Sequence, residues 1–278
     1  MAALVSAIIP AFNAERFVGD AIESVLEQEY SPVECIVVDD GSSDGTTERV
    51  QRYARVRCVS QENLGVAAAR NRGASLAGGD LLAFLDADDV WAPSRLARQV
   101  PLIANGAPAV LSAATAVDQD LKPRGIFRTR PVPTPESLLL WHGTVSGVGS
   151  TLLVRRQSFE EAGRFDERLT TSADWDLLLR LVSREAIDYV DEPLALCRVH
   201  DGGMSRTARS VDAMEHDLDI AYREAFVRSP QLRRIRRRAY ARMHWVLGRS
   251  YYGSGERWRA ARHTLSALTY DPRIVVRF

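Results

Sequence analysis

The sequence predicts an α/β protein with a doubly wound, mostly parallel sheet, followed by an all-helical appendage. Short apolar runs alternate with amphipathic segments at βαβ spacing over the first hundred residues. From about Ala208 onward every segment has helical periodicity. The chain has 278 residues, of which 46% are hydrophobic and 26% are charged. This composition is sufficient for a full hydrophobic core.

The first half of the chain should supply most of the sheet. Strands are expected at Leu4–Ile9, Cys35–Val38, Arg57–Ser60, Leu81–Leu85 and Ala109–Ala113. Helices are expected at Glu15–Gln28, Thr47–Ala54, Val66–Leu76 and from Pro93-Ser94 to about Asn105. Pro10 is expected to end the first strand, because proline cannot donate to a sheet. Right-handed crossovers between these strands would make them parallel.

The second half is less regular. Residues 117–135 contain four prolines and are predicted to form a long loop. Strands are expected at Ser150–Val154, Ile187–Val190 and Leu194–Val199, and a helix at Trp175–Ser183. Seven residues near the end have the offsets of a tetratricopeptide-type helical hairpin: Leu247, Gly248, Tyr251, Gly255, Ala260, Ala267 and Pro272. One such unit cannot bury both of its faces, so it should pack on the main domain, a partner or another surface.

Charge is distributed unevenly along a chain whose net charge is zero. Residues 1–205 hold 20 basic and 29 acidic side chains, whereas residues 206–278 hold 16 and 7. We therefore expect two domains, 1–205 and 206–278. The basic tail includes Arg233, Arg234, Arg236, Arg237 and Arg238. These arginines could attract anionic lipid headgroups or form ion pairs with the acidic main domain. No nucleic-acid-reading module accompanies them, so nucleic acid is not an expected partner.

The sequence favours a cytoplasmic protein. No apolar stretch approaches the roughly 18–20 residues that a membrane span needs. The N-terminus lacks the basic and apolar regions of an export signal. The three cysteines, Cys35, Cys58 and Cys197, are widely spaced and lack the spacing of a metal site. A peripheral position at the inner face of the membrane, through the C-terminal helices, is compatible with this pattern.

Acidic residues follow two of the expected strands. Asp39 and Asp40 end the second strand, and Asp86, Asp88 and Asp89 follow the fourth. Ligands bind at the carboxyl ends of strands in open α/β sheets. Crowded carboxylates there could bind ribose hydroxyls and a divalent cation on a diphosphate. The alternative is a pair of acidic turns that cap the helices after them.

Other nucleotide-binding motifs are missing from the sequence. No Gly-x-Gly-x-x-Gly follows the first strand, which disfavours a dinucleotide site. No Gly-Lys-Ser/Thr phosphate loop occurs anywhere. The glycine-rich basic loop of a sugar nucleotidylyltransferase is also missing.

Several segments together resemble glycosyltransferase family 2. They are residues 6–13 (SAIIPAFN), 37–44 (VVDDGSSD), 61–71 (QENLGVAAARN), 84–89 (FLDADD), 162–167 (AGRFDE) and 174–177 (DWDL). The similarity extends over roughly residues 4–205. It implies a GT-A fold and an inverting transferase that moves a sugar from a nucleotide diphosphate to an acceptor hydroxyl. Cell-surface polysaccharide or glycan synthesis is the pathway that the resemblance implies.

The same resemblance assigns nucleotide-binding and metal-binding roles. Residues of the nucleotide pocket would be Pro10, Phe12, Asn13, Asp39, Asp40, Arg70 and Asp86. Asp88 would coordinate Mg²⁺ or Mn²⁺, and Asp86 would contact the ribose or a metal-bound water. His200 would be a further metal or diphosphate contact, because neutral imidazole binds such ions; a structural role is the alternative. Asp89 is expected to cap the following helix, with a contact to the metal as the alternative.

The resemblance makes Asp174 the expected catalytic base, at the start of a helix whose dipole favours the ionised carboxylate; an ordinary carboxylate at a helix N-terminus is the alternative. The family usually has Glu-Asp-Trp here, but this chain has Ala173-Asp174-Trp175, and Asp176 is a weaker candidate for the base. Expected partners are a UDP-, GDP- or dTDP-sugar donor and a glycan or lipid-linked acceptor. Two alternatives stay open: a catalytically silent nucleotide-sugar-binding or scaffold protein, and a retaining transferase on the same fold.

Overall fold

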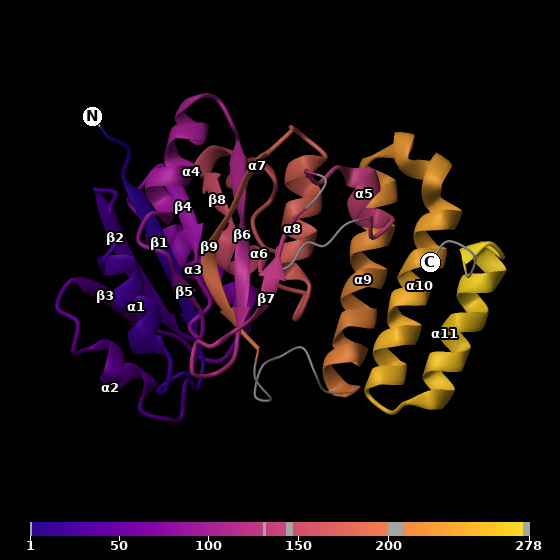
Figure 1. The fold of residues 1–278 in the computed structure, drawn as a ribbon, viewed down its shortest axis with the longest axis horizontal. Helices are drawn as coiled ribbons and strands as arrows, with labels where there is room; N and C mark the ends of the chain where they lie inside the picture. The colour runs from indigo at the N-terminus through magenta and orange to yellow at the C-terminus, as the bar shows by residue number, and fades with distance from the viewer. Residues whose placement is uncertain (1, 130–131, 143–146, 200–207, 275–278) are drawn as a thin grey trace.

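The computed structural model describes residues 2–129, 132–142, 147–199 and 208–274 (Figure 1). His200 and the expected domain boundary at Ser205 lie outside these ranges. The strands are β1 (Val5–Ala11), β2 (Val33–Asp39), β3 (Val56–Ser60), β4 (Leu81–Phe84), β5 (Val90–Trp91), β6 (Ala109–Val117), β7 (Pro123–Phe127), β8 (Leu153–Arg155) and β9 (Asp188–Arg198).

These strands form one mixed sheet. Its order among the described residues is β3-β2-β1-β4-β8-β6-β9-β5, with β7 paired to β6. The strands β3, β2, β1 and β4 are mutually parallel, as are β6 and β9. The short strands β8, β5 and β7 pair antiparallel with their neighbours. The α/β fold with a mostly parallel N-terminal half is therefore confirmed.

Helices cover both faces of this sheet. They are α1 (Val18–Leu26), α2 (Thr46–Val50), α3 (Val66–Leu76), α4 (Arg95–Ala104), α5 (Pro135–Leu139), α6 (Val148–Thr151), α7 (Arg156–Glu161), α8 (Ala173–Val182), α9 (Ala208–Arg228), the 3₁₀ helix η1 (Pro230–Ile235), α10 (Arg236–Gly253) and α11 (Arg257–Tyr270). Alternate residues of β1 belong to different hydrophobic clusters, Ile9 with α1 and α4, and Ile8 with α3 and α8. This is the side-chain alternation of a strand buried on both faces.

Pro10 does not end the first strand, contrary to the expectation. It lies inside β1 and pairs in register with Val38 of β2. The register with β4 ends at Ile8, whose carbonyl accepts from the backbone N–H of Leu85. Pro10 is two residues farther along and points its nitrogen toward the same side, beyond the paired part of β4. Its missing N–H therefore removes no ladder bond.

Three expectations for the second half were wrong in detail. Part of the expected 117–135 loop is β7, a five-residue strand that begins with Pro123 and is almost wholly exposed, so that it lacks the buried strand pattern. The two strands expected at 187–190 and 194–199 form a single strand, β9, whose register with β6 shifts near Pro193. Ser150 and Thr151 belong to the short helix α6, and the strand β8 begins only at Leu153.

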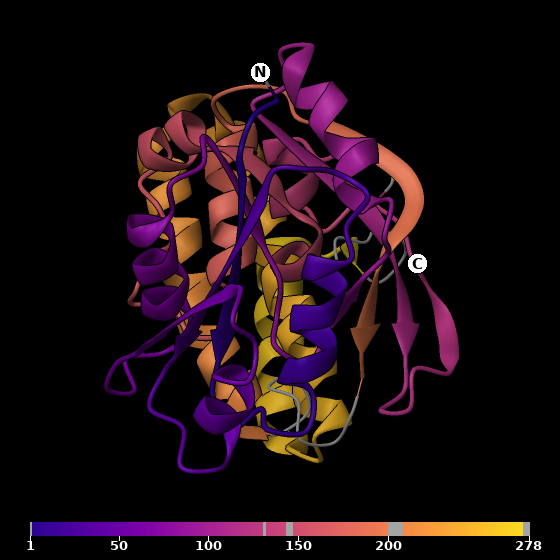
Figure 2. The ribbon, with the colours of Figure 1, turned by 90° about the vertical axis from the view of Figure 1, so that its left-hand side faces the viewer.

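The C-terminal region is helical, and α10 and α11 form the expected hairpin (Figure 1). Gly248 allows these helices to approach closely, because a Cβ there would lie 3.1 Å from Thr264 Oγ1. In Figure 2 the C-terminal helices lie behind the sheet. No helix among the described residues is both long enough and apolar enough to cross a membrane.

An aromatic stack joins this region to the main domain. The rings of Trp141 and Trp175 stack at 5.8 Å, and those of Trp175 and Tyr222 at 5.9 Å. Trp141 Nε1 donates to the Tyr222 hydroxyl over 2.8 Å, and that hydroxyl donates to the Leu139 carbonyl over 2.7 Å. One hydrophobic cluster runs from Ile8 in the sheet to these C-terminal helices. The hairpin is thus anchored through α9 to the main domain.

Candidate active site

The parallel strands bring the two acidic segments to one edge of the sheet. Asp39 ends β2 and lies beside Ala11 at the end of β1. Asp86 follows β4, whose last residue Phe84 pairs with Ile8 of β1. Because these strands are parallel, their carboxyl ends lie at the same edge, as the sequence predicted.

A buried arginine lies at the centre of this edge. Arg70 comes from α3 and is only 4% exposed. Its Nη2 lies 2.5 Å from Asp86 Oδ1, and its guanidinium lies over the Phe165 ring at 5.2 Å. Burial acts to lower the pKa of Arg70, but the nearby carboxylates of Asp86 and Asp174 outweigh it and raise that pKa above its ordinary value. Arg70 therefore remains a fixed positive charge.

Asp174 lies in the first turn of α8, close to this arginine. Its Oδ1 accepts from the backbone N–H of Trp175 over 2.7 Å, and its Oδ2 accepts from that of Gly149 over 3.2 Å. These donors and Arg70 favour the ionised form, but burial dominates and raises the pKa of Asp174. The expected effect of the helix N-terminus is thus outweighed. A raised pKa makes a carboxylate more basic.

Asp89 is a buried support and does not cap the following helix, contrary to the expectation. Its Oδ2 accepts from Ser150 Oγ over 2.5 Å, and its Oδ1 accepts from the backbone N–H of Arg198 over 2.8 Å. No side chain caps α4. Burial, followed by the charges of Asp88 and Asp86, raises the pKa of Asp89 well above its ordinary value.

Arg198 holds the same acidic turn from the other side. Its Nη1 donates to the carbonyl of Asp88 over 2.6 Å, and its Nη2 lies 2.5 Å from Asp20 Oδ2. Its guanidinium lies 4.7 Å from the centroid of the Phe17 ring. Asp88 itself is half-buried at the tip of the turn. The turn from Asp86 to Asp89 is therefore fixed by hydrogen bonds to Ser150 and Arg198.

The other acidic segment is organised by its own hydrogen bonds. Asp39 accepts from Ser42 N over 3.0 Å and from the Thr47 hydroxyl. Both oxygens of Asp40 are used within the fold, by Gln61 Nε2 and by the backbone N–H groups of Leu64 and Gly65, over 2.8–2.9 Å. The geometry of Asp40 is therefore that of a support for the 61–65 loop.

The loop after β1 completes this side of the edge. Asn13 has a left-handed backbone (φ 50°) and its Oδ1 accepts from the backbone N–H of Ser43 over 2.8 Å. This contact ties the loop after β1 to the loop after β2. Phe12 is 52% exposed, so its ring is free to meet a planar ligand. Pro10 is buried in β1 below it.

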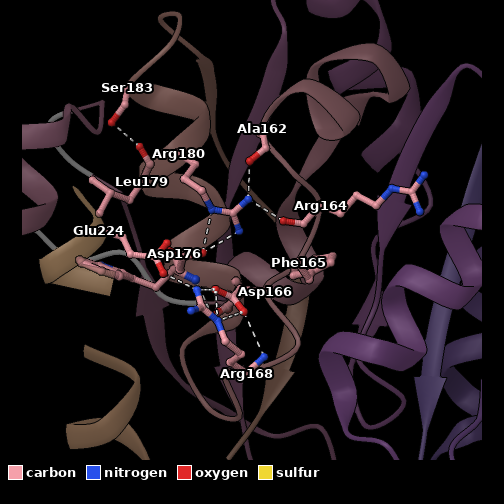
Figure 3. Close-up of polar contacts among 12 residues, drawn as sticks. Ala162, Arg164, Phe165, Asp166, Arg168, Asp176, Leu179, Arg180, Ser183 and Glu224 are labelled. Carbon is pink, nitrogen blue, oxygen red and sulfur yellow. Dashed lines mark hydrogen bonds and ion pairs between the residues drawn. The ribbon is translucent and has the colours of Figure 1, made fainter. Parts of the chain in front are cut away.

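Asp176 belongs to a separate network, in which it pairs with Arg180 of the same helix (Figure 3). Its Oδ2 lies 2.6 Å from Arg180 Nη2 and accepts from Arg180 Nε over 2.8 Å. Arg180 also donates to the carbonyls of Ala162 and Arg164 over 2.5 and 2.6 Å. With its charge paired and only 2% of its surface exposed, Asp176 is a structural residue.

The carboxylates at this edge suit a divalent cation that is also bound by a ligand. Among the described residues, no group of three or more His, Cys, Asp or Glu side chains could hold a metal alone. Asp86 and Asp88 are both part-exposed at the turn after β4. Mg²⁺ is commonly bound by one or two carboxylates together with substrate phosphates. These two carboxylates fit that arrangement.

Sequence reasoning missed the contribution of residues 149–150. A Cβ on Gly149 would lie 2.6 Å from Arg70 Nη2 and 2.8 Å from Asp86 Oδ2. Ser150 bridges the acidic turn, since its hydroxyl also accepts from the backbone N–H of Asp86 over 3.1 Å. The signal for them was the Gly147-Val148-Gly149-Ser150 sequence, which the strand expectation at Ser150 obscured.

Comparison with solved structures supports the fold. TarS 1-349 of S. aureus, solved in complex with UDP-GlcNAc, superposes with a TM-score of 0.64 over 98% of this chain and 91% of that chain, at 16% identity. The mannosyltransferase PcManGT of Pyrobaculum calidifontis, solved with GDP-Man and Mn²⁺, gives a TM-score of 0.62 over 98% of this chain and 77% of that chain, at 21% identity.

Curated relatives are more similar in sequence. An uncharacterized glycosyltransferase of Rickettsia typhi is 31% identical over 216 residues, which cover 74% of this chain and 67% of the relative. The amylovoran biosynthesis glycosyltransferase AmsB of Erwinia amylovora is 32% identical over 191 residues, 63% of this chain and 62% of that protein. The putative teichuronic acid biosynthesis glycosyltransferase TuaG of Bacillus subtilis is 33% identical over 164 residues, which cover 56% of this chain and 64% of that protein.

Some relatives are much longer than the region that aligns with this chain. For an uncharacterized glycosyltransferase of Rickettsia conorii, the aligned region is only 34% of that protein. The model of the family described as glycosyl transferase family 2 matches residues 6–163, which is more than half of this chain. The acidic turn after β4, Arg70 and the end of β2 all fall inside the match. The chain therefore belongs to glycosyl transferase family 2.

Proposed function

We propose that this glycosyltransferase transfers a sugar, with inversion, from a nucleotide diphosphate sugar to an acceptor hydroxyl in cell-surface polysaccharide or glycan synthesis. The observation that carries the proposal is the grouping of Arg70, Asp86 and Asp174 at the carboxyl edge of the sheet: Arg70 pairs with Asp86, and Gly149, which lies against both, donates its backbone N–H to Asp174. One positive and two negative groups, all part or fully buried, are fixed within one site. This arrangement can bind an anionic donor and also offer a base to the acceptor.

Each residue has a defined task in this proposal. Asp174 accepts the proton of the acceptor hydroxyl as the new bond to the anomeric carbon forms, and its raised pKa suits that task. Arg70 holds Asp86 and adds positive charge near the diphosphate. Asp39 and the Phe12–Asn13 loop line the nucleoside end of the pocket. In-line displacement requires the base and the leaving diphosphate on opposite sides of the anomeric carbon.

A divalent cation belongs to the same proposal. Asp88, with Asp86 beside it, would hold Mg²⁺ or Mn²⁺, which would neutralise charge on the departing diphosphate. The fit of the two carboxylates and the Mn²⁺ complex of the mannosyltransferase PcManGT support this view. The neighbours' complexes with UDP-GlcNAc and GDP-Man support a nucleotide-sugar donor. The names of AmsB and TuaG support a polysaccharide pathway. A glycan or lipid-linked acceptor, a cytoplasmic location and peripheral membrane contact through the C-terminal helices complete the proposal.

The test compares wild type with Asp174→Asn on a panel of UDP-, GDP-, dTDP- and CDP-sugars in the presence of Mn²⁺. Loss of a general base should lower kcat by about 10²–10⁴-fold. The matched control is Asp80→Asn, an exposed carboxylate just before β4, at the opposite end of the strand from Asp86. It should retain wild-type kcat, and the product should have the opposite anomeric configuration to the donor.

Other results would contradict the proposal in different ways. No turnover of any donor, with donor binding by wild type and Asp174→Asn alike, would favour a silent binding protein. The substitution of Ala173 for the usual Glu motivates that alternative; Ala173 is 2% exposed and belongs to the hydrophobic cluster that contains Trp175 and Tyr222. Retention of configuration would favour a retaining transferase.

A further inference from the structure

We propose that the outer face of the α10–α11 hairpin docks on a membrane surface rich in anionic lipid headgroups. The outer face is defined by six residues: Arg238, Arg249 and Tyr252 of α10, and Arg257, Trp258 and Leu265 of α11. The proposed function includes a peripheral membrane contact through the C-terminal helices, and this inference rests on that function. It assigns the contact to one surface of the outermost helices in Figure 1.

The first observation is a regular stripe along α10. Residues 238, 249 and 252 are spaced by eleven and three positions, so they lie on one side of the helix, and all three are exposed. The opposite side is buried: Met243, Leu247 and Tyr251 pack toward α9. Tyr251 confirms the direction, because its hydroxyl donates to Asp212 and Glu215 of α9 over 2.7 Å. The arginine and aromatic stripe therefore points away from the rest of the protein.

The second helix continues this surface. Arg259 and Arg262 of α11 form ion pairs with Asp212 and Glu215, so their side of the helix faces α9. Ala260 and Ala267 are buried. Trp258 and Leu265, seven residues apart, lie on one side of α11 and are both exposed. Trp245 of α10 and Leu268 of α11 pack on the same small hydrophobic cluster, which joins the two helices.

The charge of this face is entirely positive. Neither α10 nor α11 contains an aspartate or a glutamate. Arginines that face α9 find acidic partners there, as Arg259 and Arg262 do. In the described part of the chain, no ion pair is formed by Arg238, Arg249 or Arg257. Their charge is thus available to an external anionic surface, which an interfacial helix would use.

Large apolar side chains on the same face would enter the boundary between headgroups and acyl chains. Trp258 is 82% exposed, Tyr252 is 69% exposed and Leu265 is 65% exposed. Tryptophan and tyrosine favour membrane interfaces, because their rings are amphipathic. The end of a helical repeat that faces only water is normally polar. This end is apolar and cationic, as expected for a surface that is covered in use.

A second copy of the chain is a poorer occupant for this face. In a symmetric dimer the same patch meets itself, so arginines would face arginines with no carboxylate on either helix to compensate. An anionic bilayer offers both the negative charge and the apolar layer. Charge complementarity therefore favours the lipid surface.

The test is co-sedimentation of the full chain with vesicles of phosphatidylcholine alone and of phosphatidylcholine with 30% phosphatidylglycerol. We expect binding to the anionic vesicles and little to the neutral ones. The variant Arg238→Gln/Arg249→Gln/Arg257→Gln should weaken partitioning on the order of 100-fold, at roughly fivefold for each arginine. Trp258→Ser/Leu265→Ser should weaken it as well. The matched control, Arg52→Gln/Arg55→Gln/Arg72→Gln, removes three exposed arginines of the main domain.

Several outcomes would overturn the proposal. One is that the wild type binds neutral vesicles as strongly as anionic ones, and another is that it is folded and binds no vesicles at all. A third is that the main-domain control variant loses as much binding as the hairpin arginine variant. If the chain self-associates through Trp258 and does not bind vesicles, the outer face binds a second copy of the chain and not a membrane. Circular dichroism and thermal unfolding confirm that each variant is folded. Donor hydrolysis in the absence of vesicles should be equal in wild type and the arginine variant, so loss of membrane binding and failure of the transferase proposal are separate results.

Discussion

Replacing Gly149 by alanine would place a methyl group inside the Arg70–Asp86 pair. The new Cβ would lie 2.6 Å from Arg70 Nη2 and 2.8 Å from Asp86 Oδ2. Since nonbonded carbon contacts are best near 3.5–4.0 Å, these atoms must move by about 1 Å. The Arg70 side chain is only 5% exposed and cannot swing into solvent. We expect an overpacking cost of about 1–3 kcal/mol in the free energy of unfolding.

Two measurements on this variant report different consequences. Thermal unfolding should show Tm lowered by about 2–4 °C for each kcal/mol. A titration of the nucleotide sugar should show weaker donor binding, because Asp86 and Arg70 are displaced together. The control is Gly125→Ala in β7, where an added Cβ meets no atom within 4 Å. A wild-type Tm would refute the close approach, whereas a lowered Tm with unchanged donor affinity would remove the Arg70–Asp86 pair from the donor pocket.

Three further predictions follow from contacts near this site. Asp89→Asn should gain stability relative to wild type as the pH rises above about 3.8, because the carboxyl then ionises in the unfolded chain while burial, which raises its pKa, keeps it protonated in the native protein. Urea unfolding at several pH values would show parallel curves if this is wrong. Tyr222→Phe should lose about 1–3 kcal/mol, because the Trp141 N–H and the Leu139 carbonyl lose their partner; unchanged stability in urea would contradict this. EDTA should abolish sugar transfer and added Mn²⁺ or Mg²⁺ should restore it, while full transfer in EDTA would exclude the proposed cation.

Local sequence patterns predicted some helices and the ends of some strands correctly. The helix Val66–Leu76 was predicted with its observed bounds, because Gly65 starts it and its alanines pack on the sheet. The two acidic strand ends were also predicted to share one edge, which follows from parallel strands alone. Arg70 and Asp174 came from the family resemblance, and the structure places both beside Asp86.

Long-range contacts were not predictable from the sequence. Asp89 was expected to cap a helix because its partners, Ser150 and Arg198, are 61 and 109 residues away. The strand β7 is short, almost wholly exposed and without an alternating pattern, and it pairs with β6. Pro10 was expected to break a strand, but its tolerance depends on where the register with β4 ends. In each case a tertiary neighbour overrode the local pattern.

The aromatic stack has a consequence for how this enzyme can be shortened or recombined. Trp175 follows Asp174 directly in the chain and lies between Trp141 and Tyr222 of α9. Removing the C-terminal helices would uncover Trp175 and free the first turn of α8, which carries the proposed base. A chain cut at the charge boundary should therefore keep its sheet but lose accurate positioning of Asp174. Helical ends exchanged between relatives should function only when they bring a ring equivalent to that of Tyr222.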